Sequence, residues 1–430
     1  MTPTASTPPT GPTAAPPAPS LLRIVGLPYF LIAFVARLPF AMMVVGTLTL
    51  VVAARGSLSL GGLTSASVGI GTACFGPLLG AAADRYGQRR VLGILAVANA
   101  AALVALAVVV YSPAQDPFVL LSAFAIGATA PQVSPMSRSR LVMIIAERIP
   151  AGRRARTTSS TMAYESAADE TVFVFGPFLA GLFASLIAPW MPLVIAAAVI
   201  LVFVGAFALH PSASHVSVHR GVDGRATSKV SELFRIRLLV VVAGMLGVGI
   251  FFGAMLTSLT AFMTEHGRAE EAGLLYGALG VGSAIFALGV AFLPARFALP
   301  ARWLLFAGIL FGGSLLLLGV RDVPAVLVAL TVMGFGIGPT LVTQYSLGAA
   351  FGPADRSATV MTMLGAAMVV GQAIGAVTTG QVADAAGAQP ALVLPVVAAG
   401  LVLLAGAGNA LLALARRRRA ASARVPDPVR

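Results

Sequence analysis

The sequence predicts an all-α integral membrane protein with twelve transmembrane helices in two six-helix bundles. Of the 430 residues, 58% are hydrophobic and only 10% are charged, whereas a soluble domain carries roughly 25% charged residues. Apolar runs of about 20 residues, the length at which a helix crosses a bilayer, recur along the chain. A soluble globule could not bury this much apolar surface, so the solvent for most of the chain must be lipid.

Twelve apolar runs are long enough to span a membrane. They cover residues 27–52, 58–83, 90–111, 117–140, 158–186, 188–209, 238–263, 271–295, 302–320, 323–350, 357–381 and 390–414. The longest polar interruption follows the sixth run. We therefore predict a disordered cytoplasmic tail (1–26), an N-terminal bundle (27–209), a cytoplasmic central loop (210–237), a C-terminal bundle (238–414) and a basic cytoplasmic tail (415–430).

The distribution of basic residues predicts the orientation of these spans. With the N-terminus inside, the cytoplasmic segments contain all but four of the 28 Lys and Arg residues. Only Arg55, Arg268 and Arg321 fall outside, and Arg37 lies within the first span. Basic residues in short loops set membrane orientation, so both termini should be cytoplasmic. Because the net charge of +13 is spread over short loops, it does not indicate a nucleic-acid-binding surface.

A charged turn joins the second and third spans and carries a specific pattern of residues. The pattern consists of Gly80, Asp84, Arg85, Gly87, Gln88, Arg89 and Arg90. Its spacing, Gly-x3-Asp-Arg-x-Gly-x-Arg-Arg, resembles the loop between helices 2 and 3 of the major facilitator superfamily of secondary transporters. The family form is Gly-x3-Asp-Arg-x-Gly-Arg/Lys-Arg/Lys, and this chain departs from it at Gln88. The resemblance implies the twelve-helix fold of that family.

The resemblance gives Asp84 and Arg85 a role in conformational change. Asp84 ends its own helix, where the helix dipole is negative, and would be stabilised by the positive N-terminus of another helix. The eleventh span begins on the same side, near Arg356. In the family this contact holds the two halves together when the cytoplasmic side is closed. The alternative is that the charges of the turn only orient the helical hairpin.

Three carboxylates lie near the start of the fifth span, at Glu165, Asp169 and Glu170. Such acids are costly in a membrane unless they are paired or face water. Carboxylates in a partly dry cavity can take up and release protons near neutral pH. We expect Asp169 and Glu170 to couple transport to protons, with Glu165 nearer the cytoplasmic rim. Alternatively, all three acids lie at the rim and balance neighbouring arginines.

The fifth span continues with Gly176-Pro177-x-x-Ala180-Gly181. This segment resembles the Gly-Pro-x-x-Gly-Gly element of the antiporters in the same superfamily, with Ala180 in place of one glycine. The resemblance implies a hinge at Gly176, Pro177 and Gly181, and it favours exchange of a substrate against protons.

Other polar residues within the spans are candidates for binding. Arg37 should face a cavity or a carboxylate, with Asp169 or Glu170 as its partner. We expect Arg138 and Arg140 to snorkel or to act as gate charges at the cytoplasmic end of the fourth span. In the family, the first, fourth, seventh and tenth spans line the central path. On these spans, the cavity candidates are Met42, Gln132, Met136, Phe252, Gln344 and Tyr345.

These observations predict a monomeric secondary transporter of the bacterial inner membrane that works by alternating access. We expect proton-coupled efflux of small amphipathic organic compounds; the alternatives are uptake of a sugar or organic acid, and a sensor or scaffold without transport. The partners would be a small-molecule substrate, protons and the lipid bilayer, without nucleic acid. No phosphate-binding loop, nucleophile motif or metal-ligand spacing stands out, so we expect no enzyme activity, cofactor or metal.

Overall fold

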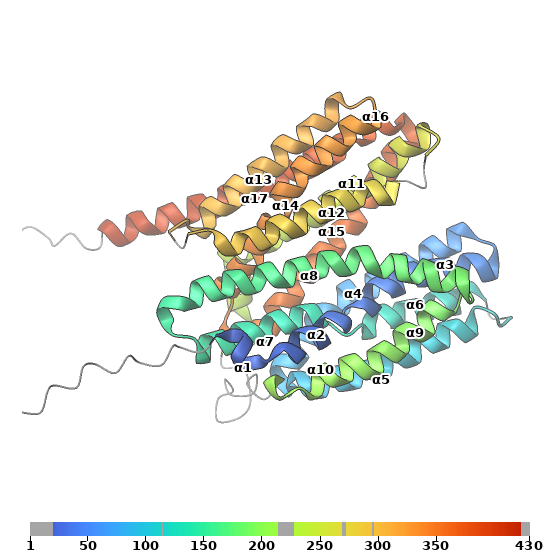
Figure 1. Ribbon diagram of the computed structural model, residues 1–430, viewed down its shortest axis with the longest axis horizontal. Coiled ribbons are helices and arrows are strands. Elements are labelled where there is room, and N and C mark those ends of the chain that lie inside the picture. The colour runs from blue at the N-terminus through green and yellow to red at the C-terminus, as the bar shows by residue number, and fades with distance from the viewer. Residues whose placement is uncertain (1–19, 114, 214–227, 269–271, 295, 423–430) are drawn as a thin grey trace, which may run out of the picture.

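The structure, a computed structural model, describes residues 20–113, 115–213, 228–268, 272–294 and 296–422. Over this part of the chain it contains helices and no strand (Figure 1). Within these described residues, twelve helical segments are long and apolar enough to cross a membrane. The predicted fold class is therefore confirmed. Of the predicted loop and tails, residues 1–19, 214–227 and 423–430 lie outside the described residues.

The helices of the first half are α1 (Leu21–Val25), α2 (Leu27–Val35), α3 (Leu38–Arg55), α4 (Leu58–Tyr86), α5 (Gln88–Val109), α6 (Asp116–Thr129), α7 (Val133–Arg148), α8 (Ala151–Leu186), α9 (Met191–Val199), η1 (Ile200–Val204) and α10 (Gly205–Leu209). Those of the second half are η3 (Val230–Phe234), α11 (Ile236–Glu265), α12 (Ala272–Gly289), η5 (Val290–Phe292), α13 (Leu299–Leu315), η6 (Leu316–Gly319), α14 (Val323–Phe351), η7 (Ala354–Arg356), α15 (Ser357–Ala386), α16 (Ala388–Ala391) and α17 (Val393–Ser422).

Two of the spans are broken near their middle, and each break has a proline beside it. The first span is interrupted between α2 and α3, just before Pro39. The fourth is interrupted between α6 and α7, where Ala130 takes an extended conformation with ψ of 120°. Ala130 precedes Pro131, and a residue before proline avoids the helical conformation. Irregular backbone at membrane depth is tolerated only where protein or a water-filled cavity satisfies it.

The helices form two groups with separate apolar cores. One core is built almost entirely from buried residues of α1 to α10, and the other from residues of α11 to α17. Figure 1 shows the first group below the second, with their axes diverging toward the α3–α4 turn. Helices α4 and α15 pack across the two groups, as do α8 and α12. Large apolar side chains such as Ile94 (69% exposed) cover the outside, as a lipid-facing surface requires.

Gln88, the residue that departs from the family motif, holds a buried arginine. Its Oε1 atom accepts a hydrogen bond of 3.0 Å from Arg140 Nε, and its Nε2 atom donates to the Met136 carbonyl. Arg140 also donates to the Phe207 carbonyl and to Ser212. Both Gln88 and Arg140 are fully buried. Arg140 therefore does not snorkel, and its alternative role as a gate charge stays a prediction. A basic residue at position 88 would face this buried cation.

We predict that Gln88→Arg destabilises the protein by more than about 2 kcal/mol, because two buried cations would lie side by side without a carboxylate between them. The measurement is the thermal unfolding midpoint of detergent-purified protein. Gln115→Arg adds the same charge at an exposed position and serves as the matched control. Equal unfolding midpoints for the two variants would contradict this account of Gln88.

Candidate functional site

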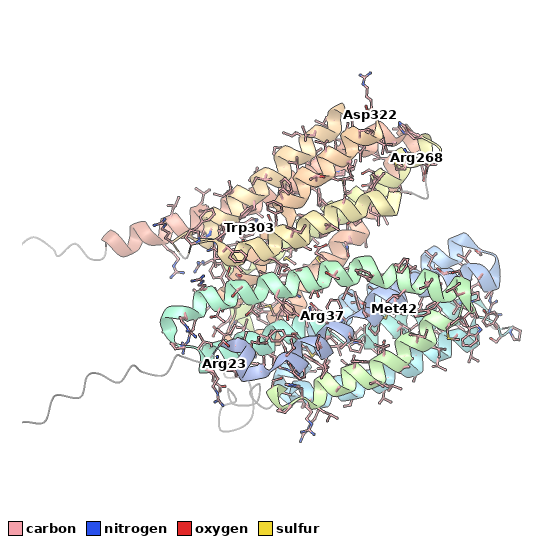
Figure 2. The ribbon with its side chains drawn as sticks, viewed as in Figure 1. Arg23, Arg37, Met42, Arg268, Trp303 and Asp322 are labelled. Carbon is pink, nitrogen blue, oxygen red and sulfur yellow. The ribbon has the colours of Figure 1, made fainter. Side chains whose placement is uncertain are left out.

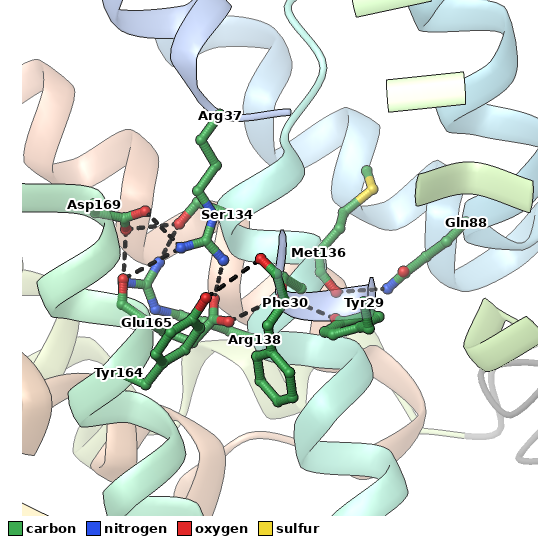
Figure 3. Close-up of polar contacts among 11 residues, drawn as sticks. Tyr29, Phe30, Arg37, Gln88, Ser134, Met136, Arg138, Tyr164, Glu165 and Asp169 are labelled. Carbon is green, nitrogen blue, oxygen red and sulfur yellow. Dashed lines mark hydrogen bonds and ion pairs between the residues drawn. The ribbon is translucent and has the colours of Figure 1, made fainter. Parts of the chain in front are cut away.

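An ion cluster of four residues lies at the break of the first span (Figure 3). Arg37, which directly precedes α3, donates through Nη2 to Glu165 Oε2 at 2.5 Å and through Nη1 to Asp169 Oδ1 at 3.2 Å. Glu165 and Asp169 lie one turn apart on α8 and face the same side. Arg138 of α7 completes the cluster through an ion pair of 2.7 Å between its Nη2 and Asp169 Oδ2.

Asp169 is held by more groups than these two guanidinium groups. The Ser134 hydroxyl donates to Asp169 Oδ2 at 2.7 Å and accepts a hydrogen bond from Arg138. The Arg138 guanidinium lies over the Tyr345 ring of α14, 3.8 Å from its centroid. Because Tyr345 belongs to the second half of the chain, the cluster touches both groups of helices. Two cations and two carboxylates compensate each other within it.

Glu165 is the more deeply buried of the two acids in the cluster. Its side chain has no exposed area, whereas that of Asp169 is 20% exposed. Glu165 Oε1 accepts a hydrogen bond of 3.0 Å from Ser137, which shares another with the Tyr29 hydroxyl. The expectation that Glu165 lies at the cytoplasmic rim is wrong, and so is the snorkelling position expected for Arg138, which is 1% exposed. Tyr29 and Ser137 were not expected in the site.

Glu170 lies apart from the ion cluster and faces the second half of the chain. Its Oε1 atom accepts a hydrogen bond of 3.2 Å from Ser283, a buried residue of α12. Among the described residues, no cation forms an ion pair with Glu170. Asp169 and Glu170 are neighbours in sequence but project about 100° apart on the helix, so one is charge-compensated and the other is not.

A cavity opens beside the cluster, with an empty volume of about 670 Å³ that includes the part open to solvent. Its polar lining comes from Arg37, Thr72, Gln132, Ser134, Asp169 and Tyr345. Its apolar lining includes Phe40, Val172, Phe173, Met368 and Val369. Both breaks contribute to it, because Arg37 and Gln132 lie at the interrupted ends of α3 and α7.

The cavity contains some of the predicted lining residues and not others. Gln132 and Tyr345 line it, and Arg37 and Asp169 join them. Met42, Met136, Phe252 and Gln344 are buried elsewhere. Figure 2 shows Met42 on α3, farther from the chain termini than Arg37. Among the described residues, no group of three His, Cys, Asp or Glu side chains could hold a metal ion.

Asp84 binds the N-terminus of α15, on the other side of the boundary between the two helix groups. Its carboxylate accepts hydrogen bonds from Ala358 N (3.0 Å), Thr359 N (2.7 Å) and Thr359 Oγ1 (2.6 Å). Gly80 permits this approach, because a Cβ atom there would lie 2.8 Å from the Ala358 carbonyl oxygen. Unpaired N–H groups and the helix dipole make a helix N-terminus a favourable place for a carboxylate.

The other residues of the turn have different surroundings. Arg85, Arg89 and Arg90 are exposed. Gly87 has φ of +90° and separates α4 from α5, a backbone conformation that favours glycine.

The predicted hinge of the fifth span lies in an uninterrupted helix. α8 runs without a break through Gly176, Pro177 and Gly181. A Cβ atom at Gly176 would collide with Ala41 of α3, whereas one at Gly181 would meet nothing within 4 Å. Gly176 therefore allows close packing of α8 against α3, and a hinge at these residues stays a prediction.

Residues 29–376 match the model of the Major Facilitator Superfamily. No curated protein sequence matches significantly. Among solved structures, the human organic anion transporter MFSD10 is 19% identical, covers 90% of this chain and 99% of its own, and has a TM-score of 0.67. A bacterial homologue of the iron transporter ferroportin, in an outward-facing state, is 16% identical, with 89% and 97% covered and a TM-score of 0.66. The E. coli fucose:proton symporter FucP is 18% identical, with 88% and 98% covered and a TM-score of 0.61. At these identities the likeness shows the fold alone.

We predict that Arg37 and Glu165 are strongly coupled in stability. Arg37→Met leaves a buried carboxylate without its partner, which costs roughly 3–5 kcal/mol. Arg37→Met/Glu165→Met removes both charges and should recover part of this loss. Thermal unfolding of the two single variants and the double variant in detergent measures the coupling. Additive losses would contradict the ion pair.

Proposed function

This chain belongs to the major facilitator superfamily, and we propose that it exports small amphipathic organic compounds in exchange for protons. Family membership indicates a secondary transporter of small molecules rather than an enzyme. The observation that carries the proposal is a charge-compensated cluster beside a cavity at two broken helices. Discontinuous helices at the interface between structural repeats are where such transporters bind substrates and coupling ions.

The lining of the cavity supports an amphipathic substrate. Most of its side chains are apolar or aromatic, and the polar groups gather around Arg37 and Asp169. A sugar would require many hydrogen-bonding groups, and this cavity offers few. The solved structures named above are those of an organic anion transporter, a homologue of an iron transporter and a fucose:proton symporter, so the fold does not decide the substrate. Our proposal of an amphipathic substrate rests on the mainly apolar lining of the cavity.

Protons couple to transport through the acids of α8 in this proposal. Asp169 lines the cavity, and Glu170 faces α12 across the boundary between the helix groups. A proton on one of these carboxylates changes the charge that a substrate meets. Competition between proton and substrate for the same carboxylates would drive export, because the proton gradient of a bacterial plasma membrane points inward.

Alternating access would proceed by rocking of the two helix groups around the cavity. The Asp84 contact with α15 closes the end of the molecule that carries the basic loops, which the charge distribution assigns to the cytoplasm. In this arrangement the described structure corresponds to a state closed toward the cytoplasm. We further propose that the protein works as a monomer in the bacterial plasma membrane, with both termini cytoplasmic.

We predict that proteoliposomes containing the protein show substrate-dependent proton movement, followed with a pH-sensitive dye. The panel contains lipophilic cations, neutral amphipathic compounds and metabolites. Asp169→Asn/Glu170→Gln should reduce the flux to the level of empty liposomes. Glu232→Gln, in a polar loop ion pair with Arg235, is the matched control and should keep the flux. Unchanged flux in the double variant would exclude these acids from coupling.

We also predict that Asp84→Ala opens the end of the molecule closed by α15. The carboxylate at this helix N-terminus contributes roughly 1–2 kcal/mol, which changes the ratio of the two states by about tenfold. Spin labels at Arg90 and Ala301, both exposed at this end, in a Cys74→Ser background should give longer distances in the variant. Asp116→Ala, at the start of α6, is the control. An unchanged distance distribution would leave Asp84 without a role in closure.

A further inference from the structure

We propose that the substrate is a monovalent organic cation and that Glu170 carries the exchanged proton, one for each substrate ion. This inference rests on the proposed function, because it assumes exchange against protons. It names the charge of the substrate and chooses between the two acids of α8. The argument uses the charges around the cavity, the neighbours of Glu170 and the aromatic side chains of the lining.

The arginines at the cavity have no free charge for an anionic substrate. Arg37 binds both Glu165 and Asp169, and Arg138 binds Asp169. The Nε atoms of both arginines lack a hydrogen-bond partner, but protein atoms cover them completely. An anion would have to displace a carboxylate from a buried ion pair, which leaves that carboxylate without compensation. The cluster therefore favours a substrate that does not need a positively charged side chain as its binding partner.

Among the described residues, no cation balances the negative charge that Glu170 adds. The titratable groups facing it are Asp169 on its own helix, Tyr276 on α12 and Tyr345 on α14. Of the other helices packed on α8, α9 and η5 contain no charged residue. The cations at α3 and α7 nearest the site, Arg37 and Arg138, bind the other two acids.

A lone carboxylate at membrane depth must be neutralised, and a proton or a cation can do so. Glu170 is adjacent in sequence to Asp169, which lines the cavity, so their Cα atoms are about 3.8 Å apart. Glu170 itself does not line the cavity, but Tyr345 does, and Tyr345 lies under the Arg138 guanidinium and near Glu170. A cation in the cavity therefore lies within the field of Glu170. With Glu170 ionised the region has a net charge of −1, and with Glu170 protonated it is neutral.

The lining also fits a lipophilic cation. Phe40 and Phe173 meet edge to face with centroids 6.4 Å apart, and both line the cavity. Aromatic faces attract organic cations through their quadrupole. The remaining wall, including Val172 and Met368, is apolar. A monovalent cation on an apolar body satisfies both the charge and the walls.

The exchange step conserves charge and atoms. The neutral Glu170 carboxylic acid loses its proton to water as the cation enters, and the carboxylate stays ionised while the cation occupies the neighbouring cavity. When the cation leaves, the carboxylate takes up one proton. One positive charge replaces another at each step, so the complete cycle is electroneutral.

Proton release on substrate binding tests this inference directly. Purified protein in weakly buffered detergent is mixed with tetraphenylphosphonium, and a pH indicator follows the protons released. Tetraphenylborate has nearly the same shape and the opposite charge, so it is the matched probe. Wild type should release up to one proton per protein with tetraphenylphosphonium and none with tetraphenylborate. Release only with tetraphenylborate, or none with either ion, would overturn the inference.

Two variants identify the group that carries the proton. Glu170→Gln should release no proton, whereas Glu232→Gln should behave as wild type. The unfolding midpoint of each variant shows that it is folded, and Glu170→Asp, which keeps the carboxyl group, should restore release. Full release from folded Glu170→Gln would overturn the assignment to Glu170. Proton-coupled transport in proteoliposomes would still stand in that case, so failure of this inference is distinguishable from failure of the proposed function.

Discussion

Charges at membrane depth must be compensated, and the centre of this molecule is organised by that constraint. Arg37 would be too costly within the first span without Glu165 and Asp169. Arg138 satisfies the second oxygen of Asp169. The cluster joins the broken first span, the second part of the fourth span and α8. Helix breaks beside Pro39 and Pro131 are tolerated here because the irregular backbone lies beside a cavity and not in lipid.

In the described part of the chain, Glu170 lacks a partner that would compensate its charge, whereas the Asp84 carboxylate is stabilised by a helix N-terminus. Glu170 accepts one hydrogen bond from Ser283, whereas Asp84 accepts three at the N-terminus of α15. Both contacts cross the boundary between the two helix groups. Rocking of the groups would change the surroundings of both carboxylates. In our account, the proton on Glu170 and the closure at Asp84 are therefore linked through the same movement.

Composition and apolar run lengths were sufficient to predict the fold class, because lipid as a solvent permits little besides helices. The spacing from Gly80 to Arg90 identified the family that the sequence comparison then showed. Hydropathy alone could not place the breaks in the first and fourth spans, although Pro39 and Pro131 were a signal for them. The burial of Glu165 and Arg138 was missed because it depends on helix rotation and tertiary pairing. The same reason explains why Met42 and Gln344 do not line the cavity.

The most direct test of proton-driven exchange is concentrative uptake of radiolabelled tetraphenylphosphonium into proteoliposomes with an acidic lumen. The membrane potential is held at zero with potassium and valinomycin, so only the proton gradient can drive accumulation. The account predicts accumulation above the external concentration and collapse of that accumulation when an uncoupler is added. It also predicts that the protein-dependent initial rate, after subtraction of uptake by protein-free liposomes, is the same when a potential is imposed. Uptake equal to that of protein-free liposomes, or uptake unaffected by the uncoupler, would contradict it.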